Sequence, residues 1–195
     1  MDKIKLIALT GGIGSGKSLA LSALKEAGYA TLSCDAITGE LYEKRKIKLM
    51  LKKMFPTAVK GFFNPIIDRK EISRIVFGDK VKHAQLTATV TPMVMQEVLR
   101  RANKIGGTVF VEVPLLFECS YQDEFDGVMV ITRPVSERVK SVISRSNLTE
   151  EQVLARIKNQ TDYENFDLSK YMVIENVGNE TALKEKVLNI AKELV

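Results

Sequence analysis

The stretch that decides the fold reads Gly11-Gly12-Ile13-Gly14-Ser15-Gly16-Lys17-Ser18, directly after the apolar segment Ile4 to Thr10. It satisfies the pattern of a glycine, any four residues, and then Gly-Lys-Ser or Gly-Lys-Thr, which is typical of phosphate-binding loops. In such a loop the glycines let backbone N–H groups turn toward phosphates, and the following helix adds its unpaired N-terminal donors. The motif therefore predicts a strand, a phosphate loop and a helix from about Lys17 to Ala27.

The side chains of this loop have separate predicted tasks. Lys17 is expected to reach the β- and γ-phosphates of a nucleoside triphosphate, and the Ser18 hydroxyl is expected to bind Mg²⁺. A dinucleotide-binding Gly-x-Gly-x-x-Gly turn is the near alternative, but Lys17 stands where its third glycine would be. A purely structural glycine-rich turn gives no reason for Lys-Ser at this point. The other nucleotide contacts are predicted at Gly12, Ile13, Gly14, Ser15, Gly16 and Leu19.

Composition excludes several other classes of protein. The chain has 195 residues, 45% of them hydrophobic, which suits one compact domain and excludes a disordered chain. No apolar run approaches the roughly 18 residues of a membrane span. The cysteines Cys34 and Cys119 form no CxxC pair, and with His83 as the single histidine they indicate neither a disulfide framework nor a zinc site. We therefore expect a cytoplasmic protein without a membrane partner. The formal net charge of +5 suggests a polyanionic ligand.

Short apolar runs alternate with helical patterns along the rest of the chain, which predicts a parallel α/β fold. The segment Ala36 to Ile105 is mainly helical, with breaks expected near Pro56, near Pro65 and at Pro92. Thr149 and Gln152 have the spacing of a helix capping box. Together these elements predict a three-layer fold on one doubly wound, five-stranded parallel sheet. Beyond the first strand, the expected strands are residues 29–33, 108–113, 128–131 and 171–175.

A small phosphoryl-transfer enzyme also needs a base, a carboxylate near the metal and cations near the phosphates. Asp35 follows the second strand, where ligands of such sheets gather, and is predicted to be the general base; a helix N-cap is the alternative. Glu112 ends another strand and is predicted to hold Mg²⁺ through water; a solvated carboxylate is the alternative. Arg138, Arg145 and Arg156 lie on a helical pair where a closing lid is expected, although a basic helical face is often only solvated.

Further blocks follow the phosphate loop in a characteristic order: Cys34-Asp35, Val113-Pro114-Leu115-Leu116-Phe117-Glu118, Arg156-Ile157-x-x-Gln160 and Ile174-Glu175-Asn176-x-Gly178. Together they resemble the dephospho-CoA kinase family over nearly the whole chain. The resemblance implies transfer of the γ-phosphoryl group of ATP to the ribose 3′-hydroxyl of dephospho-CoA, the last step of coenzyme A synthesis. It also implies a P-loop kinase fold in a single domain, with a helical acceptor-binding insert at about 36–106 and a lid at about 136–165.

The resemblance assigns roles by position. It makes Asp35 the catalytic base, Lys17 and Ser18 the phosphate and metal contacts, and Arg145 a lid arginine. It implies ATP with Mg²⁺ as the nucleotide ligand and dephospho-CoA as the acceptor. The helical insert is expected to hold the pantetheine arm of the acceptor.

The loop containing Asn176 and Gly178 is implied to lie against the adenine. Three positions depart from the family pattern, in which relatives carry an acidic residue at Ser33, a histidine at Thr91 and a basic residue near Phe166. Loss of the histidine is expected to weaken acceptor binding and leaves the phosphate loop and Asp35 intact; the sequence does not predict whether the three positions alter acceptor preference.

Two alternatives remain open from the residues alone. One is a nucleotide or nucleoside kinase, which would use the same phosphate loop with a different acceptor. The other is a non-catalytic, nucleotide-binding regulatory module with a nucleic-acid partner. The basic residues are scattered and show no interleaving with aromatic residues, so no nucleic-acid partner is expected. The sequence does not predict an oligomeric state.

Overall fold

The computed structural model describes residues 4–61 and 63–195, which form two compact units. We call residues up to 33 together with 101–195 the core unit, and residues 34–100 the insert unit. The insert unit overlaps the helical insert expected at about 36–106. That the chain forms a single domain stays a prediction.

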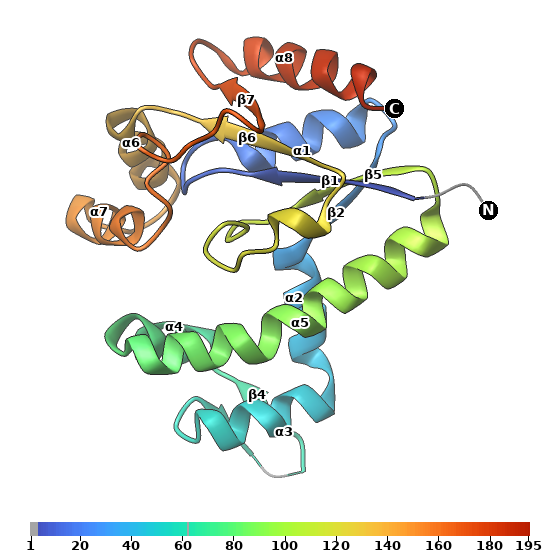
Figure 1. Ribbon diagram of the computed structural model, residues 1–195. Coiled ribbons are helices and arrows are strands. Elements are labelled where there is room, and N and C mark those ends of the chain that lie inside the picture. Colours follow the sequence, from blue (N-terminus) through green and yellow to red (C-terminus); the bar gives the residue numbers. More distant parts are fainter. Residues whose placement is uncertain (1–3, 62) are drawn as a thin grey trace. The chain divides into compact units, whose positions relative to one another are not determined.

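A five-stranded parallel sheet forms the centre of the core unit, with the strand order β2-β5-β1-β6-β7 (Figure 1). The central strand β1 pairs with β5 and β6, and its residues Leu6 to Thr10 are all buried. The predicted α/β fold on five parallel strands is confirmed. The strands are β1 (Lys5–Thr10), β2 (Ala30–Ser33), β5 (Thr108–Glu112), β6 (Gly127–Thr132) and β7 (Met172–Glu175).

Helices α1 (Lys17–Glu26) and α8 (Glu180–Glu193) pack against this sheet and against each other. Their apolar faces form one hydrophobic core with the inward side chains of the strands. Helix α1 ends as the sequence predicts, because Gly28 adopts φ 88° just after the last turn. The fully buried members of this core include Ile7, Leu9, Leu24, Phe110, Met129, Ile131 and Val187.

Helices α6 (Val135–Arg145) and α7 (Glu150–Lys158) occupy the region expected for a lid. They share a small core of Val139, Val142 and Val153, against which Ile13 of the phosphate loop also packs. The predicted capping box is confirmed, since the side chains of Thr149 and Gln152 exchange hydrogen bonds with each other's backbone N–H groups. A short 3₁₀ helix, η1 (Gln122–Glu124), precedes β6.

The insert unit is helical around its own hydrophobic core of Ile47, Leu51, Phe55, Ala58, Val59 and Ile72. It also contains an antiparallel hairpin that the sequence did not reveal, because each strand has only two residues. The elements are α2 (Cys34–Glu43), α3 (Arg45–Met54), β3 (Val59–Lys60), β4 (Ile66–Ile67), α4 (Arg69–Gly78) and α5 (Lys80–Ile105), whose last turn enters the core unit.

The helix break expected at Pro92 is wrong. Helix α5 runs through this residue for 26 residues without interruption. A proline inside a helix removes one backbone hydrogen bond and crowds the preceding turn. Burial of Val90, Val94, Met95 and Val98 on both sides of it supplies the packing that maintains the helix.

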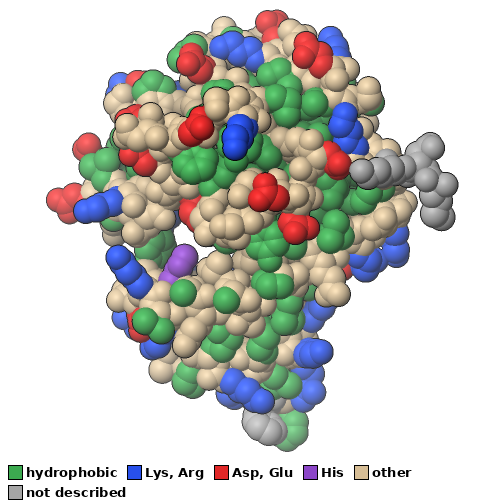
Figure 2. All heavy atoms as spheres, in the orientation of Figure 1, with side chains coloured by type: hydrophobic (Ala, Val, Ile, Leu, Met, Phe, Trp, Pro, Cys, Tyr) green, Lys and Arg blue, Asp and Glu red, His purple; other side chains and the backbone are tan. Residues whose placement is uncertain are grey.

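The positive charge is divided unevenly between the units. Residues 34–100 contain 13 Lys and Arg against 7 Asp and Glu, whereas the rest of the chain contains 16 against 17. The excess of +5 therefore comes from the insert unit. On the face drawn in Figure 2, acidic and basic side chains are interspersed over the core unit. Within the described residues, no helix has the length and apolar character needed to cross a membrane.

Candidate active site: a nucleotide pocket in the core unit

The phosphate loop joins the end of β1 to the start of α1, as the motif predicts. Gly11 adopts φ 144°, and a Cβ atom there would lie 2.2 Å from the carbonyl oxygen of Ile131 in β6. Only glycine fits this combination of backbone angle and close approach. The loop is thereby pressed against the carboxyl end of the sheet.

Lys17 turns its side chain back over the loop. Its Nζ atom donates hydrogen bonds to the carbonyl oxygens of Gly11 at 2.7 Å and of Gly12 at 3.0 Å. Charge-assisted bonds to phosphate oxygens are stronger than bonds to neutral carbonyls. Lys17 is therefore placed to exchange these carbonyls for the phosphates of a nucleotide.

A cavity of about 560 Å³ opens beside the loop. Its walls come from the start of α1, from α6 and from the segment between β7 and α8. The structure brings together six residues that the sequence had singled out from distant segments. They are Gly16, Ser18, Leu19, Arg145, Asn176 and Gly178.

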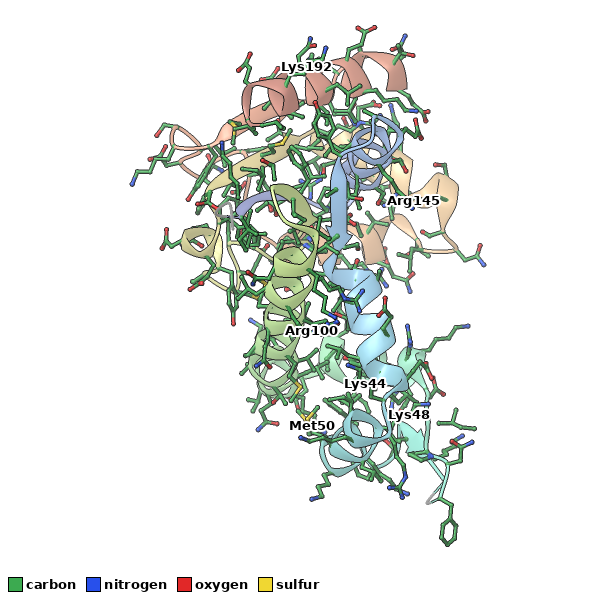
Figure 3. The ribbon with its side chains drawn as sticks, turned by 90° about the vertical axis from the view of Figure 1, so that its right-hand side faces the viewer. Lys44, Lys48, Met50, Arg100, Arg145 and Lys192 are labelled. Carbon is green, nitrogen blue, oxygen red and sulfur yellow. The ribbon has the colours of Figure 1, made fainter. Side chains whose placement is uncertain are left out.

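Cations dominate one wall of this cavity. Arg145 at the end of α6, labelled in Figure 3, lines it together with Arg133 and Lys140. Glu137 balances part of the charge, since its carboxylate lies 3.0 Å from Lys140 Nζ and 3.7 Å from Arg133 Nη2. The remaining positive charge suits an anionic ligand such as a nucleotide. Arg133 was missed from sequence, although its place directly after β6 marks it as a strand-end residue.

Asn176 links the end of β7 to the phosphate loop. Its Nδ2 atom donates to the Ser15 carbonyl at 2.7 Å, and its backbone N–H donates to Thr132 at 2.9 Å. The side chain is buried, so this link is rigid. An adenine contact by Asn176 stays a prediction; the observed contact positions the loop.

Arg138 does not lie on a solvated basic face. It is 4% exposed, and its Nε atom donates to the Ile13 carbonyl at 2.9 Å. Burial lowers the pKa of Arg138, which the nearby Tyr163 and Glu164 partly oppose. A Cβ atom on Gly12 would lie 2.2 Å from its Nη2 atom, so the guanidinium fills the space beside the loop.

Glu112 lies at the end of β5 and is buried, which excludes the alternative of a solvated carboxylate. Ser33, its register partner on β2, donates a hydrogen bond from Oγ to Glu112 Oε2 at 3.1 Å. Within the described residues, no three His, Cys, Asp or Glu side chains cluster as a metal site. The hydroxyl of Ser18 and the carboxylate of Glu112 are oxygen ligands of the kind that Mg²⁺ prefers.

Asp35 belongs to the insert unit. It is exposed in the first turn of α2, two residues after Ser33 ends β2. The helix begins at Cys34, so Asp35 stands inside the first turn rather than at the cap position that was its alternative role. An exposed carboxylate at this place is accessible to a ligand.

The Val-Pro-Leu-Leu-Phe-Glu block anchors the segment that follows α7. The Phe117 ring packs against the rings of Tyr163, Phe166 and Tyr171, with centroid distances of 6.0, 4.7 and 5.1 Å. Glu118 Oε1 accepts a hydrogen bond from the backbone N–H of Thr161 at 2.7 Å. Phe166, one of the departures from the family pattern, thus has a packing role here.

Tyr163 in this segment was not singled out from sequence. Its hydroxyl is buried, and burial raises its pKa to about 12. Thr10 and the Gly11 backbone lie near enough to offset part of this rise, yet neither makes a hydrogen bond of good geometry with the hydroxyl. The neutral phenol is therefore the stable form in the folded protein.

Comparison with known proteins gives the family. The family model described as dephospho-CoA kinase matches residues 5–182. The chain belongs to the dephospho-CoA kinase family. It is 34% identical to the dephospho-CoA kinase of Thermus thermophilus, over 97% of this chain and 91% of that relative. It is 35% identical to the dephospho-CoA kinase of Thermobifida fusca, over 96% of this chain and 95% of that relative.

Solved structures share the fold of this chain. A crystal structure of a Thermus thermophilus protein matches with a TM-score of 0.85 and 33% identity, and the match covers 100% of both chains. A dephospho-CoA kinase from Campylobacter jejuni shares the fold, with a TM-score of 0.68 at 24% identity over 98% and 97% of the two chains. The resemblance drawn from sequence is confirmed, and the chain is a kinase and therefore a transferase.

Proposed function

We propose that this chain transfers the γ-phosphoryl group of ATP to the ribose 3′-hydroxyl of dephospho-CoA, giving coenzyme A and ADP. The observation that carries the proposal is the intact phosphate loop beside a cation-lined cavity, in a chain that belongs to the dephospho-CoA kinase family. Lys17 and Arg145 supply positive charge for the phosphates. Asn176 and Gly178 line the cavity where the adenosine would lie.

Asp35 is proposed as the general base. Its carboxylate would take the proton of the 3′-hydroxyl while that oxygen attacks the γ-phosphorus. The bond between the γ-phosphorus and the bridging oxygen then breaks, and ADP leaves with the electron pair. Support comes from its place just beyond the carboxyl end of β2, where ligands of parallel α/β sheets gather.

Ser18 and Glu112 are proposed to hold Mg²⁺, together with water and phosphate oxygens. When bound, the ion neutralises charge on the phosphates. Ser33 orients the Glu112 carboxylate through its hydrogen bond. Replacing Ser18 with Ala should raise the Mg²⁺ concentration needed for half-maximal activity, whereas Ser22→Ala, one turn further along α1, should leave it unchanged.

An acceptor panel tests the reaction. The enzyme is given ATP and Mg²⁺ with dephospho-CoA, AMP or adenosine, and ADP release is measured together with the mass of the product. Turnover with dephospho-CoA and little with the others supports the proposal. Faster phosphorylation of AMP or of a nucleoside would contradict it and assign a nucleotide or nucleoside kinase. We further propose that the reaction takes place in the cytoplasm.

A further inference from the structure

Ile13, in the phosphate loop, is bound from both sides by the lid region. Its backbone N–H donates to Gln160 Oε1 at 2.7 Å, and its carbonyl accepts from Arg138 Nε at 2.9 Å. Its side chain packs into the small core that α6 and α7 share around Val142 and Val153. The backbone of this one loop residue is thus held on both sides by two side chains and a hydrophobic contact, all from residues more than 120 positions away.

Arg138 is an unusual group to bury at this place. Its Nη2 atom has no hydrogen-bond partner, and the guanidinium makes no ion pair within the described residues. Glu164 lies near enough to stabilise the charge in part, but it does not form an ion pair with the guanidinium, so burying this cation is costly. Here its charge lies against Gly12, on the loop that receives phosphates.

We infer that Arg138 and Gln160 are positioning residues that hold the backbone of Ile13 and so keep the phosphate loop in its phosphate-binding form. Arg138 also adds a fixed positive charge beside the loop. The inference rests on the proposed ATP site. In this arrangement α6 and α7 contact the loop before ATP binds. The loop is therefore already ordered, and ATP binding does not have to offset the entropy lost on ordering it.

Gln160 and Arg138 differ in what they contribute. Gln160 contributes a neutral hydrogen-bond acceptor, so replacing it removes a contact that orders the loop but changes no charge. Arg138 offers a donor and a charge, so its loss removes ordering and attraction together. The effect on ATP affinity should therefore be larger for Arg138, and salt should change it little because the guanidinium is buried.

The test measures equilibrium binding of ATP to the full chain without acceptor. Gln160→Leu should raise the dissociation constant about tenfold, equivalent to ~1.4 kcal/mol, and Arg138→Met should raise it further. Arg138→Lys keeps the charge and a donor, and should recover part of the affinity. In turnover, KM for ATP should rise in both neutral variants while KM for dephospho-CoA stays unchanged.

Val187→Ala is the matched control. It removes packing from the main hydrophobic core of the same unit and should lower thermal stability, but it lies outside the small core against which Ile13 packs. A merely structural role would make all three variants less stable with unchanged ATP affinity. Wild-type ATP affinity in folded Gln160→Leu and Arg138→Met would overturn the inference, whereas failure of the wild-type chain to bind ATP would overturn the proposed function itself.

A measurement on the unaltered protein covers the case in which these variants do not fold. Amide hydrogen exchange followed by NMR should show the Ile13 N–H strongly protected without ATP, because it is hydrogen-bonded to Gln160. Exchange of this amide as fast as in an unstructured loop would overturn the inference.

Discussion

The core unit and the insert unit differ in the polar contacts that stabilise each of them internally. In the core unit, polar contacts that matter to the site join residues far apart in sequence, such as Asn176 and Ser15. In the insert unit, the ion pairs Arg74–Glu71 in α4 and Arg100–Glu97 in α5 join residues three positions apart on one helix, and the charge of the unit is strongly positive. Arg69 and Glu43 form an ion pair between more distant positions of this unit. The site in the core unit therefore depends on contacts between distant segments, whereas the insert unit carries the excess positive charge, which would attract an anionic acceptor.

Asp35→Asn gives the largest expected effect and separates chemistry in the insert unit from binding in the core unit. The amide cannot take the hydroxyl proton, so kcat should fall by a factor of about 10²–10⁴. The dissociation constant of ATP should stay unchanged, because the nucleotide cavity lies within the core unit. Rapid-quench turnover and calorimetric ATP titration measure the two quantities.

The control for this prediction is Asp68→Asn in the same unit. Asp68 caps α4 by accepting from the Glu71 N–H, and asparagine caps helices equally well. Turnover of Asp68→Asn should match the wild type. Wild-type turnover of Asp35→Asn would show that Asp35 is not the base.

A glycine-to-alanine change in each unit sharpens the comparison. Gly11 and Gly61 both have positive φ angles, and a Cβ atom would lie 2.2 Å from Ile131 O and 2.9 Å from Asn64 O respectively. Both variants should lose about 1–3 kcal/mol of stability. Only Gly11→Ala should also weaken ATP binding, by about tenfold or more. Thermal unfolding measures the stability of the two variants, and calorimetric titration measures their affinity for ATP. Equal ATP affinity of Gly11→Ala and Gly61→Ala would contradict a requirement for glycine in the phosphate loop.

Alkaline pH probes the buried phenol of Tyr163 in the core unit. Its pKa is raised to about 12 on folding, so below pH ~10 the hydroxyl is neutral in both states and its ionisation contributes nothing to the pH dependence. Between pH ~10 and ~12 the unfolded chain loses this proton and the folded chain does not. The unfolding free energy should therefore fall by about 1.4 kcal/mol per pH unit in that window.

Tyr163→Phe should remove this slope, while Tyr171→Phe, in the same aromatic cluster, should retain it. Urea unfolding at pH 9 and pH 11 measures the difference. A slope that survives Tyr163→Phe would assign the alkaline loss of stability to another group.

Pro92→Ala is expected to have the smallest effect, and a stabilising one. It restores a backbone donor in the middle of α5 and should raise the unfolding free energy by about 1 kcal/mol. Gln96→Ala, on the same helix and exposed, should change it by less than about 0.5 kcal/mol. Denaturant midpoints give both values. Loss of stability in Pro92→Ala would show that the proline ring is required for packing.

Local chemistry explains what could be predicted from sequence. The phosphate loop, the stop at Gly28 and the Thr149 capping box each depend on residues within a few positions of one another. The five strands followed from short apolar runs, and the fold from their alternation with helices. The hairpin β3–β4 escaped detection because two residues make no pattern.

The contacts that shape the site could not be predicted in the same way. The hydrogen bonds from Asn176 to Ser15 and from Ile13 to Gln160 span most of the chain, and no local pattern specifies them. The burial of Arg138 did have a signal, because it shares the stripe of Val135, Val139 and Val142 at helical spacing. The positive charge of Arg138, however, led us to expect a side chain that is solvated or faces phosphate. The role of Asp35 stays a prediction.

The close approach of Arg138 to Gly12 has an evolutionary consequence. Gly12 does not have a positive φ angle, so backbone strain does not require glycine there; the volume of the guanidinium does. The two positions are therefore expected to change together during divergence. Alanine at position 12 is then expected mainly beside a smaller residue at position 138, and only where the approach of the loop to phosphate also tolerates the added methyl group.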